Sequence, residues 1–200
     1  DRESWRYYNA VISLGGEQGF YYKQHLVPFG EYLPLRWLIG TTLDALAVPN
    51  ADFSGGGEGQ TLLMAAGVPV SSSICFEVVF GEQIIRDLPE AALLVNVSND
   101  AWFGDSLAPH QHLEMARMRA RETGRPMLRA TNTGISAVID QRGEIIARSE
   151  QFETAVVTAT VTPRQGATPY VRMGNWPALS VSVLLLLLPL VAGRWRRSGG

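Results

Sequence analysis

Lysine and cysteine are almost absent from this chain of 200 residues. Lys23 is its only lysine, the other sixteen basic residues are arginine, and Cys75 is its only cysteine. A single cysteine excludes an internal disulfide bond but leaves the redox compartment open. The net charge of −2 comes without a stripe of basic residues, and phosphate binding needs clustered cations. Nucleic acid is therefore not an expected partner.

The rest of the composition is that of a folded domain. Hydrophobic residues make up 46% of the chain and charged residues 18%, so a core can be buried. A length of 200 residues suits one domain, or one domain with an appendage. The chain begins without a methionine or a signal sequence, and its first residues already include a strand pattern, VISL (11–14). We therefore expect it to be part of a longer protein.

Hydrophobic patterns alternate between strand and helix over the first two thirds of the chain, and a meander follows. The glycine-rich loop SGGGEGQ (54–60) lacks the Gly-Lys-Ser/Thr of a phosphate-binding loop and is interpreted as a surface loop. Helical patterns lie at 33–47, 82–90 and 113–124. Strand patterns lie at 11–14, 61–67, 68–76, 91–100, 127–134, 135–140, 144–149 and 154–161, with a hairpin turn at 141–143. This order predicts an α/β sandwich.

Residues 173–193 form a run of 21 residues without a charge. As a helix this run would be about 31 Å long, close to the ~30 Å hydrocarbon core of a bilayer. Trp176 and Trp195 stand at its two ends, as interfacial anchors do, and Pro189 is tolerable in a membrane helix. The run therefore predicts a transmembrane helix, and a buried core helix is the alternative.

Charges on the two sides of this run predict its orientation. Three arginines lie in the tail, RWRRSGG (194–200), against Arg172 alone on the near side. The positive-inside rule then puts residues 194–200 in the cytoplasm and the domain at 1–172 on the opposite face of the membrane.

Cys75 stands where the strand pattern VPVSSSIC gives way to a helical one. A nucleophile at such a turn is exposed, and backbone N–H groups of the turn can stabilise an oxyanion. The alternative is an inert cysteine that packs as a small hydrophobe.

Lys23 would complement such a nucleophile. A free thiol has a pKa of about 8.5 and only the thiolate attacks, so a nearby ammonium would favour the reactive form. Lysine can also shuttle a proton, which arginine cannot. Glu31 and Glu77 could orient the lysine or take a proton. A solvated cation for Lys23 and surface salt bridges for the two glutamates are the alternatives.

Other polar residues are weaker candidates. His110, His112 and Glu114 could form a partial metal site, but capping or surface roles are the favoured interpretation. The arginines at 117, 119 and 121 are interpreted as a solvated helix face.

Three segments together resemble the nitrilase superfamily, the carbon–nitrogen hydrolases. They are YYKQHLVPFGEYLP, which carries Lys23 and Glu31, SSSICFEVVFGE, which carries Cys75, and residues 96–140, which include NDAWFG and RATNTG. The resemblance covers nearly all of residues 5–195. It implies an α-β-β-α sandwich with a Glu-Lys-Cys catalytic triad. The triad glutamate of the family lies well upstream of the lysine, and neither Glu3 nor Glu17 has the expected context, so we expect it to precede this chain.

The motif NDAWFG, the helix after it and RATNTG resemble a branch of the superfamily that lies in the bacterial inner membrane and has a periplasmic catalytic domain. This resemblance implies acyl transfer from a phospholipid donor, through a Cys75 thioester, to the amine of a diacylated apolipoprotein acceptor. It implies no metal or cofactor. Lys23 and the N–H of Phe76 would hold the oxyanion, with Glu31 and Glu77 in support. Trp102 and Phe103 would line an acyl-chain pocket, unless they are core residues. A carbon–nitrogen amidase and an inactive membrane-anchored binding module are the alternatives.

Overall fold

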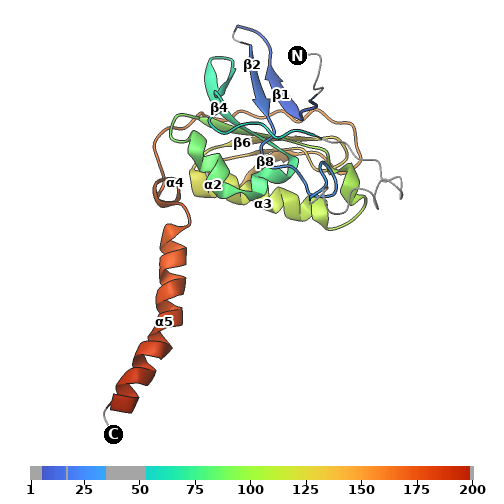
Figure 1. Cartoon of the computed structure of the whole chain (residues 1–200). Helices are drawn as coiled ribbons and strands as arrows, with labels where there is room; N and C mark the ends of the chain where they lie inside the picture. Colours follow the sequence, from blue (N-terminus) through green and yellow to red (C-terminus); the bar gives the residue numbers. More distant parts are fainter. Residues whose placement is uncertain (1–5, 17, 35–52, 199–200) are drawn as a thin grey trace, which may run out of the picture.

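A six-stranded sheet organises this computed structural model, which describes residues 6–16, 18–34 and 53–198 (Figure 1). The strands are β1 Ala10–Ser13, β2 Gly19–Tyr22, β3 Leu63–Ala65, β4 Val68–Ile74, β5 Leu93–Ser98, β6 Met127–Thr131, β7 Ala137–Ile139 and β8 Ile145–Arg148. The helices are η1 Cys75–Val79, α2 Gly81–Ile84, η2 Ile85–Asp87, η3 Asp100–Phe103, α3 Ala108–Thr123, α4 Pro169–Met173 and α5 Trp176–Ser198.

The order of the strands brings three chain segments to one edge of the sheet. The sheet order is β3-β4-β5-β6-β7-β8, and β1 and β2 form a separate antiparallel pair. Strands β4, β5 and β6 run parallel, whereas the remaining neighbours in the sheet are antiparallel. Because parallel strands end at the same edge, the residues that follow β4, β5 and β6 gather there. This edge carries Cys75, Asp100 and Asn132.

Each face of the sheet is covered by a different layer. Leu94, Met127 and Ile139 pack against α2 and α3 in one core cluster. Their neighbours along the strands point the other way, and Leu93 and Leu128 pack against the β1–β2 pair. This alternation is the period of two that a strand buried on both sides imposes. Figure 1 shows the helices on one side of the sheet and the β1–β2 pair on the other.

Most of the predicted elements are confirmed, and the expected α/β architecture with them. Helix α3 starts earlier than predicted and ends at Gly124, whose φ of +66° is the left-handed conformation that terminates helices. The helix predicted at 33–47 lies almost entirely outside the described residues. Of the α-β-β-α layers, the described residues form one helical layer, the six-stranded sheet and the β1–β2 pair.

The strand predicted at 154–161 is wrong. Its alternating pattern is real, since Val157, Ala159 and Val161 are half-buried and their neighbours exposed. Its backbone joins neither sheet within the described part of the chain. The residues alternate as in a strand, but a β-ladder also requires hydrogen bonds to a neighbouring strand, and this segment forms none with the described strands.

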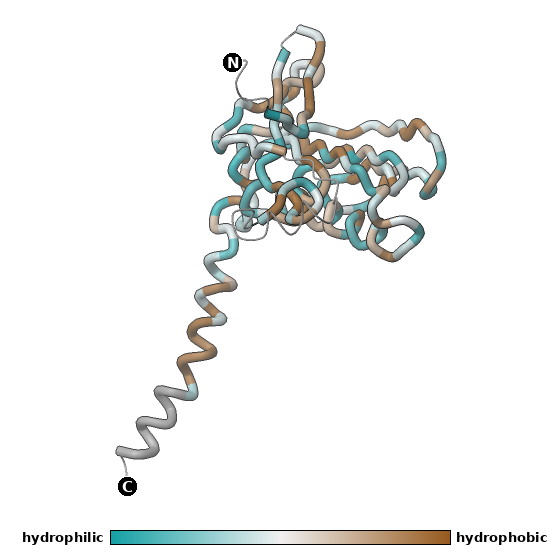
Figure 2. The backbone as a smooth tube through the Cα atoms, turned by 45° about the vertical axis from the view of Figure 1, so that its right-hand side comes forward, coloured by the Kyte–Doolittle hydropathy of each residue, from teal (hydrophilic) through white to brown (hydrophobic). Residues whose placement is uncertain are grey.

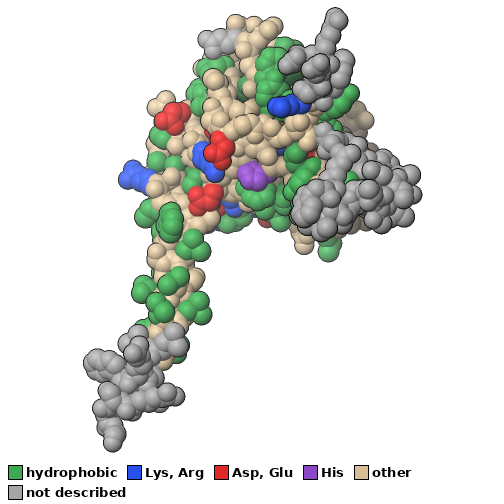
Figure 3. Space-filling view, viewed as in Figure 1, with side chains coloured by type: hydrophobic (Ala, Val, Ile, Leu, Met, Phe, Trp, Pro, Cys, Tyr) green, Lys and Arg blue, Asp and Glu red, His purple; other side chains and the backbone are tan. Residues whose placement is uncertain are grey.

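Helix α5 extends away from the domain (Figure 1). Most of its described residues are hydrophobic (Figure 2), and its described side chains are exposed (Figure 3), Leu186 at 73%. The alternative of a buried core helix is therefore wrong for this part of the segment. Within residues 6–16, 18–34 and 53–198, no helix is both long enough and apolar enough to cross a membrane. The transmembrane helix predicted at 173–193 is thus not confirmed.

The base of α5 is attached to the domain by polar contacts. The Glu82 carboxylate accepts a hydrogen bond of 2.7 Å from the N–H of Asn175, directly before α5. Thr168 caps α4 and also donates to the carbonyl of Glu122 at 2.5 Å. Glu122 forms an ion pair of 2.8 Å with Arg119, and both side chains are mostly buried. The solvated helix face expected for the arginines of α3 is therefore wrong for Arg119, because α4 covers it.

The Glu122→Gln variant tests this junction through its pH dependence. Burial raises the pKa of Glu122 from its ordinary value to about 6, although the charge of Arg119 opposes the shift. A carboxyl whose pKa is raised by folding favours the folded state below its ordinary pKa, and that contribution is lost as the pH rises through 6. From pH 4.5 to 7.5 the stability of the variant relative to wild type should therefore rise by about 1–2 kcal/mol.

Denaturant unfolding of the full-length protein at several pH values measures this difference. Parallel stability curves for wild type and Glu122→Gln would contradict the assignment.

Candidate active site

Cys75 occupies a sharp turn between β4 and η1. It is the first residue of η1, its φ is +54°, and the residue is partly exposed. Non-glycine residues rarely adopt a positive φ, because the Cβ then crowds the backbone, and such strain concentrates at functional sites. The turn lifts the cysteine out of the sheet. The alternative of a cysteine packed in the core is wrong.

Lys23 follows β2 and is buried together with a carboxylate. Its side chain is 1% exposed, and its Nζ lies 2.7 Å from Oε1 of Glu31. The same Oε1 accepts from Asn9 Nδ2 at 2.6 Å, and Oε2 accepts from the N–H of Val27 at 2.8 Å. A buried ammonium is stable only with a partner whose remaining lone pairs are also satisfied. The solvated cation and the surface salt bridge expected as alternatives are wrong for these two residues.

Glu77 joins the segment of Lys23 to the segment of Cys75. It is 0% exposed. Its Oε1 accepts hydrogen bonds from the N–H of Gln24 at 2.7 Å and of His25 at 3.1 Å, directly after Lys23. Its Oε2 accepts from the N–H of Ile74 at 2.7 Å, directly before Cys75. One carboxylate therefore sets how the backbone beside the lysine lies against the backbone beside the cysteine.

Two further side chains complete the environment of Glu77. Tyr21 donates to Oε2 at 3.0 Å and Gln83 to Oε1 at 3.0 Å. Burial, with the charge of Glu77, raises the pKa of the Tyr21 phenol, so its proton stays available for this bond. Together with the backbone N–H groups, these side chains place a hydrogen-bond donor at every contact of the two Glu77 oxygens. This arrangement makes it a positioning residue and excludes the surface salt bridge that was its alternative.

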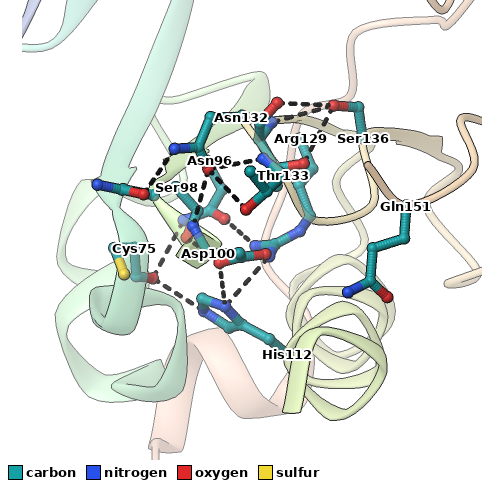
Figure 4. A network of polar contacts seen from close by, with 12 residues as sticks. Cys75, Asn96, Ser98, Asp100, His112, Arg129, Asn132, Thr133, Ser136 and Gln151 are labelled. Atoms are coloured by element: carbon teal, nitrogen blue, oxygen red, sulfur yellow. Dashed lines mark hydrogen bonds and ion pairs between the residues drawn. The ribbon is translucent and has the colours of Figure 1, made fainter. Parts of the chain in front are cut away.

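A second polar group contacts the backbone of Cys75 (Figure 4). The Nε2 of His112, on α3, lies 3.1 Å from the carbonyl oxygen of Cys75, and its Nδ1 lies 3.1 Å from Oδ1 of Asp100. Oδ2 of Asp100 pairs with Arg129 Nη2 at 2.8 Å, and Arg129 donates in turn to Asn96 Oδ1. These residues come from α3, η3, β6 and β5, and all are buried.

Asp100 is ionised in this group. Burial alone would raise its pKa, but hydrogen bonds from His112 and Ser98 and the charge of Arg129 outweigh burial and hold the pKa below its ordinary value. Burial lowers the pKa of Arg129, and Asp100 counteracts it. The pair is therefore a buried ion pair whose two members depend on each other.

Residues 110–112 were only partly interpreted correctly from the sequence. His110 is exposed, as expected, but His112 is 5% exposed, so its predicted capping or surface role is wrong. The signal was available, since His112 shares the buried face of α3 with Ala116 and Ala120 at intervals of four. Within the described residues, no group of three or more His, Cys, Asp and Glu side chains could hold a metal ion.

The aromatic candidates lie on the surface near this group. Trp102 and Phe103, on η3, are 76% and 38% exposed, so the core-packing alternative is wrong for Trp102. The ring of Phe103 meets that of His112 edge-on at 6.1 Å. Phe76 is 39% exposed, and its N–H lies in the first turn of η1. Glu3 and Glu17, considered for the triad glutamate, lie outside the described residues.

The sequence and the fold together define the class of protein. The family model of the carbon–nitrogen hydrolases matches residues 1–170. The fold is similar to that of a carbon–nitrogen hydrolase from Helicobacter pylori G27, with a TM-score of 0.57 at 16% identity over 78% of this chain and 56% of that one. The NitFhit protein of C. elegans gives a TM-score of 0.54 at 18% identity, over 73% of this chain and 36% of that one. The chain belongs to the carbon–nitrogen hydrolase family.

Relatives within the family carry a more particular name. The chain is 56% identical to an apolipoprotein N-acyltransferase of Methylococcus capsulatus over 176 residues, which are 88% of this chain and 35% of the relative. It is 53% identical to the enzyme of the same name from Nitrosomonas europaea over 182 residues, 90% of this chain and 37% of that relative. The chain thus spans little more than a third of these relatives' length.

The Glu77→Gln variant tests the joining role of this carboxylate. Every contact of the Glu77 oxygens is with a donor, so an amide NH₂ in either orientation faces an N–H that loses its acceptor. An unsatisfied buried donor costs roughly 1–3 kcal/mol, and with the lost charge we expect a destabilisation of about 2–4 kcal/mol. Denaturant unfolding of the full-length protein measures it.

Glu153→Gln, at an exposed position, is the matched control and should unfold like the wild type. Equal stability of Glu77→Gln and Glu153→Gln would show that the carboxylate does not hold the two segments together.

Proposed function

We propose that the protein is an apolipoprotein N-acyltransferase, which moves an acyl chain from a phospholipid to the N-terminal amine of a diacylglyceryl-cysteine lipoprotein. The observation that carries the proposal is the joint anchoring of Cys75 and Lys23. The backbone beside the strained, partly exposed Cys75 and the backbone beside the buried Lys23 are both hydrogen-bonded to one carboxylate, Glu77. The relatives of this name support the choice of acyl donor and acceptor.

In the first half of the reaction, a general base takes the proton of the Cys75 thiol. We assign the base to the triad glutamate that the family resemblance implies upstream of Lys23. The thiolate attacks the sn-1 ester carbonyl of the phospholipid, and the resulting oxyanion is held by the Lys23 ammonium and the Phe76 N–H. Collapse of this intermediate breaks the ester C–O bond, gives a thioester on Cys75, and releases a lysophospholipid that takes the proton.

In the second half, the α-amine of the lipoprotein attacks the thioester. The C–S bond breaks, an amide forms, and the thiol recovers its proton through the same base. Thioesters suit this step because amines attack them readily. Glu31, 2.7 Å from the Lys23 Nζ, holds the lysine in place through both halves. Trp102 and Phe103, exposed beside the group of His112, are proposed to contact the acyl chain.

We also propose a membrane setting for this chemistry. Both substrates carry acyl chains, so the site must work at a lipid surface. The charge-free run at 173–193 and the arginines at 194–200 support a domain on the periplasmic face of the inner membrane and a cytoplasmic tail. Exposed leucines on the described part of α5 are compatible with lipid around it.

Acylation of Cys75 tests the proposed function directly. Full-length protein incubated with labelled phospholipid and without acceptor should gain one acyl chain on Cys75, found by mass spectrometry of the peptide, and addition of a diacylated lipopeptide should remove it. Cys75→Ala should gain none. If wild type gains no acyl mass but hydrolyses small amides, the protein is an amidase instead. If Cys75→Ala restores growth of a strain depleted of the enzyme, the domain acts as an inactive binding module.

Replacement of Lys23 by arginine tests the second proposed catalytic group. The buried position holds an ammonium 2.7 Å from Glu31, and a guanidinium is broader and cannot act as a point charge there. Loss of one oxyanion donor typically lowers kcat by roughly 10²–10³, and we expect Lys23→Arg to fall in this range.

The control exchanges an exposed cation in the opposite direction. Arg86, which pairs with Glu58 and is 52% exposed, should tolerate replacement by lysine without a change in transfer rate. A Lys23→Arg enzyme as fast as Arg86→Lys would remove Lys23 from the mechanism.

A further inference from the structure

The carbonyl of Cys75 is held by two side chains from neighbouring elements. His112 Nε2 lies 3.1 Å from it, and Asn96 Nδ2 donates to it at 3.4 Å. Figure 4 shows this carbonyl pointing toward His112. Neither contact involves the sulfur, so these residues act on the backbone of the nucleophile.

The peptide unit that carries this carbonyl also carries an N–H group. The C=O of Cys75 and the N–H of Phe76 belong to one peptide unit, which is planar, so they point in opposite directions. Whatever fixes the direction of the carbonyl therefore fixes the direction of the N–H. The φ of Cys75, +54°, is costly for a non-glycine residue and persists only when the surroundings hold it.

The chemistry of the contact settles which nitrogen of His112 carries hydrogen. A carbonyl oxygen only accepts, so Nε2 must donate to it. Nδ1 lies 3.1 Å from Oδ1 of Asp100, an acceptor, and 3.1 Å from Nη2 of Arg129, a donor. A protonated Nδ1 has Asp100 as its partner, and a bare Nδ1 has Arg129. The Nε2 hydrogen bond therefore exists in both charge states of the ring.

The contacts close into a ring of hydrogen bonds. It runs from the Cys75 carbonyl through His112, Asp100, Arg129 and Asn96 and back to the same carbonyl. The ring is tightly enclosed, since a Cβ added at Gly134 would lie 2.1 Å from Oδ2 of Asp100. A closed group of buried charges joined in this way is rigid, because any rotation breaks a charged hydrogen bond.

We propose that His112 is a positioning residue that aims the Phe76 N–H at the oxyanion formed when Cys75 attacks an ester. Asp100 and Arg129 hold the imidazole in place, and Asn96 supports the same carbonyl. The inference rests on the proposed function in one respect, namely that Cys75 attacks an acyl carbonyl. It adds a group that acts on the transition state through the backbone and touches no substrate.

Two replacements of His112 separate this role from simple packing. The amide nitrogen of glutamine can reach the position of Nε2, so His112→Gln keeps a donor to the Cys75 carbonyl. The amide of asparagine reaches only the position of Nδ1, so His112→Asn keeps a polar partner for Asp100 and Arg129 but loses the donor. Both variants bury a neutral amide at the same site, which makes them a matched pair.

Two reactions of the thiol in full-length protein provide the readout. Acylation by p-nitrophenyl octanoate passes through an oxyanion, whereas alkylation by iodoacetamide displaces iodide and forms none. We expect His112→Asn to lower the rate of acylation roughly tenfold to a hundredfold, and to leave alkylation within about twofold of wild type. His112→Gln should recover most of the lost acylation rate.

Other outcomes overturn the proposal. Equal loss of acylation and alkylation in His112→Asn would mean that the residue only maintains the fold around Cys75. Equal acylation rates for the asparagine and glutamine variants would mean that the donor to the carbonyl is irrelevant. The activated ester keeps this test apart from the proposed function. Wild type that accepts p-nitrophenyl octanoate but no phospholipid refutes the transferase and leaves the role of His112 measurable.

Discussion

The carboxylate of Glu77 is the contact on which the geometry of this site depends. Cys75 and Lys23 are far apart in sequence, and they lie on different layers of the fold. The sheet core alone would leave their relative position to the packing of apolar side chains, which tolerates small shifts. Five donors on one buried carboxylate do not tolerate them, because each has a preferred distance and direction. Directional bonds therefore provide the precision that hydrophobic packing lacks.

The backbone around Cys75 is fixed by two sets of side chains, one that accepts hydrogen bonds and one that donates them. On one side, Glu77 accepts from backbone N–H groups and sets where the chain runs. On the other, His112 and Asn96 donate to a backbone carbonyl and set how one peptide unit is turned. Both arrangements act on main-chain atoms, so they are compatible with a partly exposed thiol. The cost is a set of buried charges, Asp100 and Arg129 among them, that are stable only as a group.

The sequence predicted the parts of this protein that depend on local pattern. Strand and helix periods placed β4, β5, β6 and α3, and the rarity of lysine and cysteine pointed to Lys23 and Cys75. It did not predict contacts that depend on which elements become neighbours. The alternation at 154–161 carried no information about whether a strand would lie beside it. His112 was misinterpreted because its partners approach it only after folding: Asp100 follows β5, and Arg129 lies in β6.

The attachment of α5 also bears on how a lipid would reach the thiol. Glu82, which binds the residue before α5, lies only seven positions after Cys75, in the short helical stretch of η1 and α2. This hydrogen bond links the residue before α5 to the same short helical stretch that carries Cys75, and so places the start of α5 relative to the thiol. A glycerolipid ester normally lies just below the headgroups of its leaflet. In the proposed reaction the ester would therefore have to rise to the thiol, and contacts made to its acyl chain would have to supply the energy of that partial extraction.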